Sequence, residues 1–479
     1  MAAISPARKA AFQILMAVER GHSHSDDLLR GKAVNALSAA DRNLATALVL
    51  GVLRWQIRLD HQLQALLKRP NAKLDAEICI ALRLGAFQML HMDRIPARAA
   101  IDESVELAKQ AGHRFASGMV NAVLRKLGGT FFNFSEESAA ELALAQAHPE
   151  WMVERWAGFY GMEAARAICR HGQSQPLLTV RLSASAPVEH ARPIEARGFP
   201  PFPQEDAERM GHPDLERELA DADIVLERGE LLTAARTVLS GDITATAAFQ
   251  EGRTRLQDEG SQLVAELAST VLVQKVKSIV DACAAPGGKT MILAERNPEA
   301  HIVACESSEP RWEQLRKRLA AYADRVECRL GDASAMEEAS ASDLVLADVP
   351  CSGTGTLGRN PEIRHRLRPE DLARHAERQR GLLRAALRVV RPGGRVVYST
   401  CSLEPEENQQ VVAAVLAESP GARLLPLAAG IESLLKEGIV APAGAEKLLA
   451  SITPEGFLRL LPGAFHTDGF FIATMERVA

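Results

Sequence analysis

Long hydrophobic runs are absent from this sequence. No stretch reaches the roughly 18 consecutive apolar residues that a membrane-spanning helix needs. One apolar run, from Ala10 to Val18, follows Arg8 and Lys9, but Gln13 interrupts it and no cleavage site of small residues follows. We therefore expect an amphipathic first helix, and neither a membrane anchor nor a signal peptide.

Aromatic side chains and net charge are also scarce. Aromatic residues make up 4% of the 479 residues, with only three Tyr, and the formal net charge is −5. Stacking of bases on aromatic rings is therefore excluded as the main grip on a nucleic acid, and the whole-chain charge gives no sign of a polyanionic partner. The hydrophobic fraction of 47% is ordinary for a globular protein, which excludes a disordered or fibrous chain.

Paired cysteine motifs are missing as well. The seven cysteines are an odd number and contain no C-x-x-C pair. They are Cys79, Cys169, Cys283, Cys305, Cys328, Cys351 and Cys401. This pattern argues against a disulfide framework or a metal site and favours the reducing cytoplasm, where free thiols are available for chemistry.

The charged residues are distributed unevenly along the chain. Residues 1–128 hold 18 Lys and Arg against 11 Asp and Glu, a net of +7, and the remainder holds 38 against 50, a net of −12. Up to Gly129 apolar residues recur at helical spacing, Ser38-Ala-Ala-Asp41 has the form of a helix start, and Pro96 predicts a break between helices. We expect a basic, all-helical first domain over residues 1–140.

The middle of the chain has a mixed pattern. A helix is predicted over 151–160 and a strand over 177–182, before a proline-rich loop at 200–203. These features predict a small α/β connecting domain over residues 145–245.

Strands and helices alternate over residues 250–479, the predicted third domain. Short runs rich in Val and Ile predict strands over 278–283, 301–305, 326–330, 343–349, 394–400 and 469–474. Amphipathic segments predict helices over 261–271, 287–296, 309–322, 369–390 and 404–417. The alternation is typical of a Rossmann-like α/β fold with a doubly wound, largely parallel sheet. Such folds bind ligands at the carboxyl ends of their strands.

A glycine-rich turn follows the first of these strands. The segment Asp281-Ala-Cys-Ala-Ala-Pro-Gly-Gly-Lys-Thr290 leads into a helix, and its glycines let the backbone approach a ligand. It is not a phosphate-binding loop, because Cys283 stands where that loop needs its first glycine. The Gly-x-Gly-x-x-Gly dinucleotide fingerprint is absent too. A tight turn without a ligand is the alternative.

Carboxylates follow the next two strands. Glu306 ends the second strand and Asp332 follows the third. An acidic residue about 20 residues past the glycine turn can bind both ribose hydroxyls of a nucleoside cofactor, and Asp332 is placed to hold an adenine amino group. Glu306 alone would be interpreted as a surface carboxylate. The glycine-rich turn, Glu306 and Asp332 follow three successive strands, and together they favour a nucleoside-binding site.

A carboxylate and two thiols follow the fourth and fifth strands. The fourth leads into Asp348-Val-Pro-Cys351-Ser-Gly-Thr-Gly, and the fifth ends in Ser-Thr-Cys401-Ser. A single Cys is more often a small buried hydrophobic residue. Two at the ends of strands favour thiol chemistry, although the residues alone leave open which of the two acts as nucleophile.

These motifs resemble those of a known family. Pro-Gly-Gly-Lys, Asp-Val-Pro-Cys-Ser-Gly-Thr-Gly and Ser-Thr-Cys-Ser are similar to the motif set of the Sun/Fmu family of S-adenosylmethionine-dependent RNA cytosine-5 methyltransferases. The pair of cysteines differs from the Pro-Cys motif of DNA cytosine methyltransferases. Segments 41–54 and 118–125 resemble the RNA-binding antitermination factor NusB. The fusion is similar to bacterial methyltransferases of small-subunit (16S) rRNA.

The resemblance implies a role for each motif residue, with S-adenosylmethionine as the cofactor. The methionine end of the cofactor would be lined by Cys283, Ala284, Ala285, Pro286, Gly287, Gly288 and Lys289. Glu306, which is usually Asp in the family, would hold the ribose, Asp332 the adenine, and Asp348 would lie between cofactor and base. Cys401 would be the nucleophile and Cys351 would assist release of the enzyme.

Methylation at C5 of cytosine accounts for both thiols. C5 is a poor nucleophile, but attack of a thiolate on C6 builds an enamine whose C5 can accept a methyl group. Asp348 is placed to support this attack at N3. A second group must then remove the C5 proton. The base must leave its stack to reach the thiol, so a single-stranded region is the expected substrate.

Seven arginines within 22 residues are candidates for contacts with RNA phosphates. They are Arg359, Arg364, Arg366, Arg368, Arg374, Arg378 and Arg380. Interspersed acidic residues such as Glu370 and Glu377 leave open the alternative of a solvated helix face.

The expected partner is 16S rRNA or a small-subunit assembly intermediate, and the protein is expected to be a cytoplasmic monomer without membrane or metal. Two other functions remain open. One is a non-catalytic RNA-binding ribosome-assembly factor on a methyltransferase fold, which the intact Cys351, Cys401 and Asp348 disfavour. The other is a Rossmann oxidoreductase, which the missing dinucleotide fingerprint disfavours.

Overall fold

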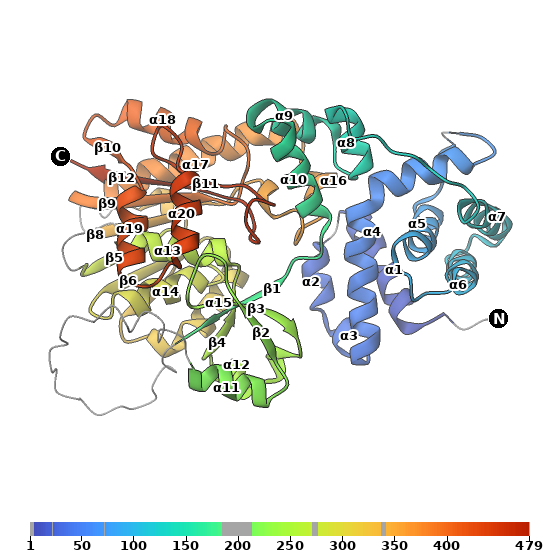
Figure 1. Ribbon diagram of the computed structural model, residues 1–479, viewed down its shortest axis with the longest axis horizontal. Coiled ribbons are helices and arrows are strands. Elements are labelled where there is room, and N and C mark those ends of the chain that lie inside the picture. The colour runs from blue at the N-terminus through green and yellow to red at the C-terminus, as the bar shows by residue number, and fades with distance from the viewer. Residues whose placement is uncertain are drawn as a thin grey trace. The chain divides into compact units, whose positions relative to one another are not determined.

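A computed structural model of the chain forms two compact units (Figure 1). The residues that the structure describes are 4–21, 23–70, 72–183, 213–270, 276–336 and 342–478. The first unit holds Met1–Gln175 together with Leu357–Leu367, and the second holds Pro176–Thr356 with Arg368–Ala479. The three-domain division stays a prediction, and the two units divide its middle part between them. The predicted proline-rich loop at 200–203 lies outside the described residues.

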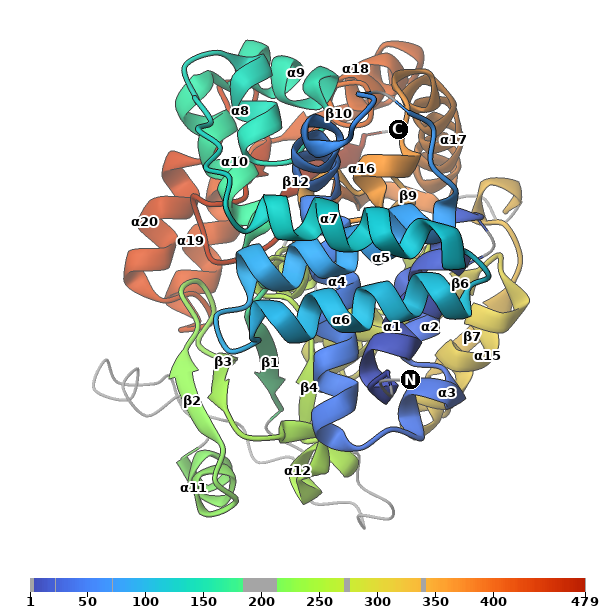
Figure 2. The same cartoon turned by 90° about the vertical axis from the view of Figure 1, so that its right-hand side faces the viewer.

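The first unit is helical throughout its described part. Its longer helices are α1 (Pro6–Glu19), α4 (Ala39–Leu66), α5 (Ala76–His91), α6 (Ala97–Gln110), α7 (Ser117–Leu127), α9 (Glu150–Tyr160) and α10 (Met162–Gln173). Shorter helices are α2 (Ser25–Leu29), α3 (Lys32–Asn35), α8 (Ala139–Ala145) and α16 (Ile363–Arg366). Figure 2 shows α5, α6 and α7 lying side by side.

Local sequence explains where the helices of this unit begin and what they bury. The Ser38 hydroxyl accepts a hydrogen bond from the Asp41 amide, which caps α4 as predicted. Pro96 is the N-cap of α6, at the predicted break. Apolar residues at helical spacing, such as Leu48 and Val52 in α4, form the buried core of the unit.

The segment Leu357–Leu367 is anchored in the first unit by a buried arginine. The guanidinium of Arg364 donates to the carbonyls of Arg54 and Gly172, at 2.8 and 2.6 Å. Burial lowers the pKa of Arg364 to about 9. The expectation that Arg364 binds RNA phosphate is therefore wrong, because its side chain is 3% exposed and is used inside the fold.

The second unit is built on a largely parallel sheet, as predicted. The strands are β5 (Ser278–Asp281), β6 (His301–Glu306), β7 (Val326–Leu330), β8 (Ser342–Asp348), β9 (Val390–Thr400), β10 (Ala422–Leu425), β11 (Leu458–Leu460) and β12 (Phe470–Arg477). Their order is β10-β12-β9-β8-β5-β6-β7, and β11 pairs with β12. The pairing is parallel from β7 through β6, β5 and β8 to β9. Strand β12 is antiparallel to its neighbours.

Helices cover both faces of this sheet. One face packs against α13 (Glu259–Thr270), α14 (Gly288–Arg296), α15 (Glu309–Arg318), α19 (Ala428–Lys436) and α20 (Pro442–Ala450), and the other against α17 (Pro369–Val389) and α18 (Gln409–Glu418). Successive strand residues alternate between the two cores, as Ile279 and Val280 do in β5. Burial on both faces explains why these strands are continuous apolar runs in the sequence.

A smaller antiparallel sheet precedes the large one. Its order is β2-β3-β1-β4, with bounds β1 (Leu178–Leu182), β2 (Val225–Arg228), β3 (Ala235–Ser240) and β4 (Thr254–Leu256). Helices α11 (Pro213–Asp221) and α12 (Ala247–Gln250) accompany it. Only β1 was predicted, because β2 is short and largely solvent-exposed and lacks the alternation of a half-buried strand.

One helix starts later than its sequence pattern indicates. A helix was expected from residue 404, but α18 begins at Gln409. The residues before it form a turn in which the Tyr398 hydroxyl donates to the Glu407 carbonyl. That buried tertiary bond uses a carbonyl oxygen that a longer helix would direct along its own axis.

Three further observations concern membranes, metals and thiols. Among the residues described, no helix combines the length and the apolar character needed to cross a bilayer. The same residues contain no cluster of three or more His, Cys, Asp or Glu suited to a metal ion. All seven cysteines are free thiols.

The packing of α4 against α5 gives a matched test of the helical core. A Cβ added at Gly51 would lie 2.0 Å from the Phe87 ring, whereas one added at Gly158 in α9 would meet nothing within 4 Å. We expect Gly51→Ala to destabilise the protein by about 1–3 kcal/mol through overpacking. Gly158→Ala should stabilise it by about 0.5–1 kcal/mol through helix propensity. Chemical unfolding measures both; equal effects would contradict the packing described.

Candidate active site

A pocket opens at the carboxyl edge of the large sheet, where the strand order reverses. The chain runs outward from β5 through β6 to β7 and then returns to β8 on the other side of β5. Open α/β sheets bind ligands at such a point. The pocket there has a volume of about 240 Å³. It is lined by Ala282, Cys283, Ala285, Glu306, Ser307, Arg311, Gly331, Asp332, Ala333, Asp348, Val349, Pro350, Cys351, Arg378, Leu382 and Cys401.

Most of the sequence-predicted residues lie in this pocket or in a smaller one beside it. The smaller cavity, of about 100 Å³, is lined by Ala284, Pro286, Gly288 and Lys289 and shares Cys283, Ala285 and Asp348 with the first. Gly287 lines neither cavity and is the N-cap of α14, with a φ of 103° that favours glycine. The predicted set is thus gathered at one edge, with Gly287 shaping the turn.

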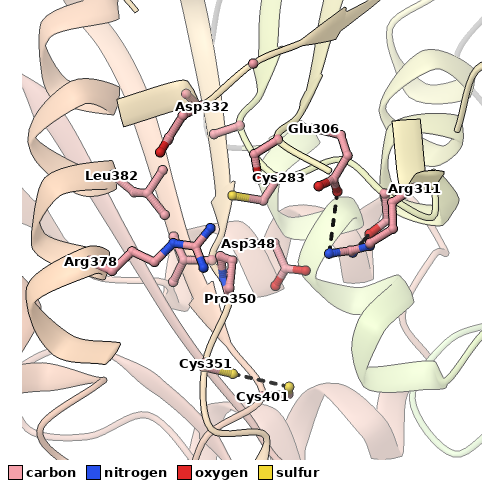
Figure 3. A pocket seen from close by; sticks show the side chains of 16 residues that line it. Cys283, Glu306, Arg311, Asp332, Asp348, Pro350, Cys351, Arg378, Leu382 and Cys401 are labelled. Atoms are coloured by element: carbon pink, nitrogen blue, oxygen red, sulfur yellow. Dashed lines mark hydrogen bonds and ion pairs between the residues drawn. The ribbon is translucent and has the colours of Figure 1, made fainter. Parts of the chain in front are cut away.

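Figure 3 shows the carboxylates Glu306 and Asp332 on either side of Cys283, with Asp348 below all three. Glu306 is 5% exposed and its Oε1 accepts from the Ser308 amide at 2.9 Å, while Oε2 lies 3.5 Å from the Arg311 guanidinium. Asp332 Oδ1 accepts from the Ser334 amide at 2.9 Å. Both carboxylates are therefore fixed by the turns that follow their strands.

Asp348 sits between a lysine and a serine. Its Oδ2 lies 2.7 Å from Lys289 Nζ, and its Oδ1 accepts from the Ser399 hydroxyl at 2.6 Å. Burial disfavours the charge on Lys289, but Asp348 and the nearby Cys401 and Asp281 outweigh it and raise the pKa of the lysine. Lys289 is consequently a cation held beside both Asp348 and a thiol.

The two thiols face one another. The Sγ atoms of Cys351 and Cys401 are 3.4 Å apart, and Figure 3 shows both at the same end of the pocket. The hydrogen bond with Cys401, burial and the negative charges of Cys401 and Glu407 together raise the pKa of Cys351 well above its usual value. These causes all disfavour the thiolate form of Cys351.

Neither thiol lies at the start of a helix. α18 begins eight residues beyond Cys401, at Gln409, so its dipole does not act on that thiol at close range. Cys401 is one of the groups that raise the pKa of Lys289, so this thiol and the lysine lie close enough to interact.

Sequence reasoning missed some of the pocket. Arg311 and Leu382 were not singled out, and Arg378 was expected to contact RNA phosphates but lines the pocket. Arg378 and Leu382 are four residues apart on α17, which puts them on one helix face. That spacing was visible in the sequence, but the side of the sheet that α17 covers was not.

Three of the remaining predicted arginines have neighbours of their own. Arg374 pairs with Asp371 and Arg380 with Glu377, each three residues away on α17. Arg366 donates to the Ser23 carbonyl in the first unit. These contacts favour the alternative of a charged helix face for Arg374 and Arg380, and leave RNA contact by the other arginines a prediction.

Both ends of the chain match known protein families. Residues 269–476 match the model described as 16S rRNA methyltransferase RsmB/F, and residues 5–128 match the NusB family. The probable ribosomal RNA small subunit methyltransferase B of Bacillus subtilis is 33% identical over 98% of both chains. The ribosomal RNA small subunit methyltransferase B of Vibrio cholerae is 31% identical over 98% of this chain and 96% of its own.

This chain belongs to the RsmB family of 16S rRNA methyltransferases. The predicted family, the NusB-like first part and the assignment as an rRNA methyltransferase are confirmed. The oxidoreductase and the non-catalytic assembly factor are accordingly set aside.

Solved structures agree on the fold. The structure titled "Crystal Structure of PH0851" superposes with a TM-score of 0.74 at 24% identity and covers 99% of both chains. NSun6 from Pyrococcus horikoshii, solved with SFG, gives 0.53 at 17% identity over 70% of this chain and 99% of its own. The Rossmann-like methyltransferase fold predicted for this RsmB-family chain is confirmed.

The coupling of the two thiols predicts how they react with an alkylating agent. Cys401→Ala removes the hydrogen bond and the charge that raise the pKa of Cys351, so the pKa of Cys351 falls and its thiolate fraction rises at fixed pH. We expect iodoacetamide at pH 8 to label Cys351 faster in this variant than in the parent, as measured by peptide mass spectrometry. Labelling of Cys328, on β7, should not change. Unchanged or slower labelling of Cys351 would contradict the coupling.

Proposed function

We propose that this RsmB-family enzyme transfers a methyl group to C5 of a cytosine in 16S rRNA through a covalent bond between Cys401 Sγ and C6 of the base. The observation that carries the proposal is the pair of sulfur atoms 3.4 Å apart beside the Asp348 carboxylate. One thiol is needed to activate the ring and a second group to let the enzyme leave, and this site supplies both at one place.

The proposed cofactor is S-adenosylmethionine, and the residues of the pocket fit it. Carboxylates at the ends of β6 and β7 suit hydroxyl and amino donors of a nucleoside, so Glu306 would hold the ribose and Asp332 the adenine. Residues Cys283–Lys289 would line the methionine end. When bound, the cofactor supplies an electrophilic methyl group. Glu306, longer than the family's usual Asp, folds back onto the Ser308 amide, which keeps its carboxylate at the strand end.

We assign different roles to the two thiols. The hydrogen bond with Cys401 and burial raise the pKa of Cys351, which therefore keeps its proton. Cys401, which stands where the family motif has its nucleophile, attacks C6, and this moves electron density to C5. As the ring takes up negative charge, N3 gains a proton from water and donates a hydrogen bond to the Asp348 carboxylate, which supports the attack.

Release of the enzyme completes the reaction. Loss of the C5 proton lets the C5–C6 double bond form again as the bond from Cys401 Sγ to C6 breaks. Water takes up the C5 proton, and Cys351, which keeps its own proton, would donate a hydrogen bond to the departing sulfur of Cys401 beside it. Removal of Cys351 should leave the attack possible and stop the enzyme as its RNA adduct.

The proposed substrate is a single-stranded region of 16S rRNA, because an unstacked base is needed to reach Cys401. The net charge of +7 on residues 1–128 supports RNA contact by the NusB-like part, mainly through phosphates and with affinity that falls as salt rises. Such a substrate places the enzyme in the cytoplasm. Whether it acts as a monomer, and on naked RNA or an assembly intermediate, stays a prediction.

Variants of the two thiols test the proposal. With transcribed 16S rRNA and S-adenosylmethionine, Cys401→Ser should abolish methyl transfer, because the attacking sulfur is gone. Cys351→Ser should accumulate a protein–RNA adduct that survives denaturing electrophoresis. The double variant with both Cys351→Ser and Cys401→Ser should form no adduct. Full activity of Cys401→Ser, or an adduct trapped in that variant, would contradict the assigned roles.

A further inference from the structure

A buried glutamate lies behind the two cysteine loops and outside the pocket lining. Glu407 is 0% exposed, in the turn between β9 and α18. Its Oε1 accepts from the Ser352 amide and from Gln379 Nε2, each at 2.9 Å. Its Oε2 accepts from the hydroxyls of Ser352 and Ser402. All four hydrogen bonds come from neutral donors on three different segments.

These partners belong to the residues next to the thiols. Ser352 directly follows Cys351, and Ser402 directly follows Cys401. The two serine hydroxyl oxygens are 3.0 Å apart, and Gln379 also donates to the carbonyl of Pro350, which precedes Cys351. One carboxylate thus binds the residue after each thiol directly, and it is connected through Gln379 to the residue before Cys351.

A buried carboxylate holds its hydrogen-bond partners firmly in place. Loss of any hydrogen bond to the Glu407 carboxylate costs free energy, because water cannot reach the buried oxygen and replace the lost donor. The loops can therefore not separate without leaving the charge of Glu407 unsatisfied. The same charge contributes to the raised pKa of Cys351, after the hydrogen bond with Cys401 and burial.

The two loops depend on Glu407 to different degrees. Ser402 is also held by Asn408, whose Nδ2 donates to the Ser402 carbonyl at 2.8 Å, and Asn408 Oδ1 accepts from the Thr400 hydroxyl. Ser352, in contrast, directs both its amide and its hydroxyl at Glu407. Loss of the carboxylate should therefore displace Cys351 more than Cys401.

We propose that Glu407 is a positioning residue that fixes the separation of the two thiols and thereby sets how efficiently the enzyme is released from its RNA adduct. The first part rests on the contacts above. The second part rests on the proposed function, so the two parts need separate tests.

The first test uses the full chain without RNA or cofactor. Dibromobimane reacts with two thiols and becomes fluorescent when it bridges them, and peptide mapping identifies the Cys351–Cys401 bridge. In Glu407→Ala we expect bridging to slow about tenfold, since small displacements of reacting groups are costly. Glu407→Gln, which keeps the shape and can still hydrogen-bond both serines, should retain most of the parent rate. Glu418→Gln, an exposed change at the end of α18, is the matched control and should equal the parent.

Thermal unfolding of every variant checks that the variant is folded. If Glu407→Ala does not fold, Ser352→Ala removes one of the hydrogen bonds to Oε2 and replaces it in the comparison. Bridging at the parent rate in Glu407→Ala, or in Ser352→Ala where that variant is used, overturns the proposal.

The second test follows the reaction with 16S rRNA. The ratio of trapped adduct to methylated product should rise about tenfold in Glu407→Ala, because Cys351 is displaced more than Cys401. A merely structural role would lower the folded fraction and leave this ratio unchanged, which would refute the release part. If no variant, Cys351→Ser included, forms an adduct while bridging still depends on Glu407, the proposed function fails and the positioning role stands.

Discussion

The parallel pairing of β8 with β9 is the constraint on which the site depends. It sets Asp348 opposite Ser399, so the loops that carry Cys351 and Cys401 leave the sheet side by side. The Gly355 amide then donates to the Cys401 carbonyl at 2.9 Å, and a Cβ at Gly355 would lie 2.8 Å from that carbonyl oxygen. Glycine is needed there because the two loops approach so closely. Residues 50 positions apart in the sequence become one reactive pair.

Two carboxylates beside this pair have different environments and different consequences. Asp348 faces the pocket and is balanced by Lys289, so it can meet a substrate beside the two thiols. Glu407 lies behind the loops, satisfied by hydroxyl, amide and main-chain donors, and holds the loops in place. The chemistry of the thiols therefore depends on one carboxylate in front of them and one behind them.

Much of this site could be predicted from the sequence because the ends of strands in an α/β sheet can be recognised there. Apolar runs followed by Gly, Asp or Cys located Cys283, Glu306, Asp332 and Asp348 at one edge. What could not be predicted depends on contacts between distant segments. Arg364 looks like a basic surface residue until its partners, the carbonyls of Arg54 and Gly172, are known.

Glu407 illustrates the same limit. In the sequence it is one of several glutamates at the apparent start of a helix, and nothing local distinguishes it from Glu406. Its role follows from donors on the β8 loop and on α17, which only the folded chain brings to it. The short strands β2 to β4 also escaped notice, since strands with so few buried residues carry little hydrophobic signal.

Bisulfite sequencing of 16S rRNA tests the central claim most directly, because 5-methylcytosine resists deamination. Cells that lack this chain would be supplied with either the parent chain or Cys401→Ser. The account predicts a protected cytosine in single-stranded 16S rRNA with the parent chain and its loss with Cys401→Ser. Protection that persists with Cys401→Ser, or that never depends on the chain, would contradict it.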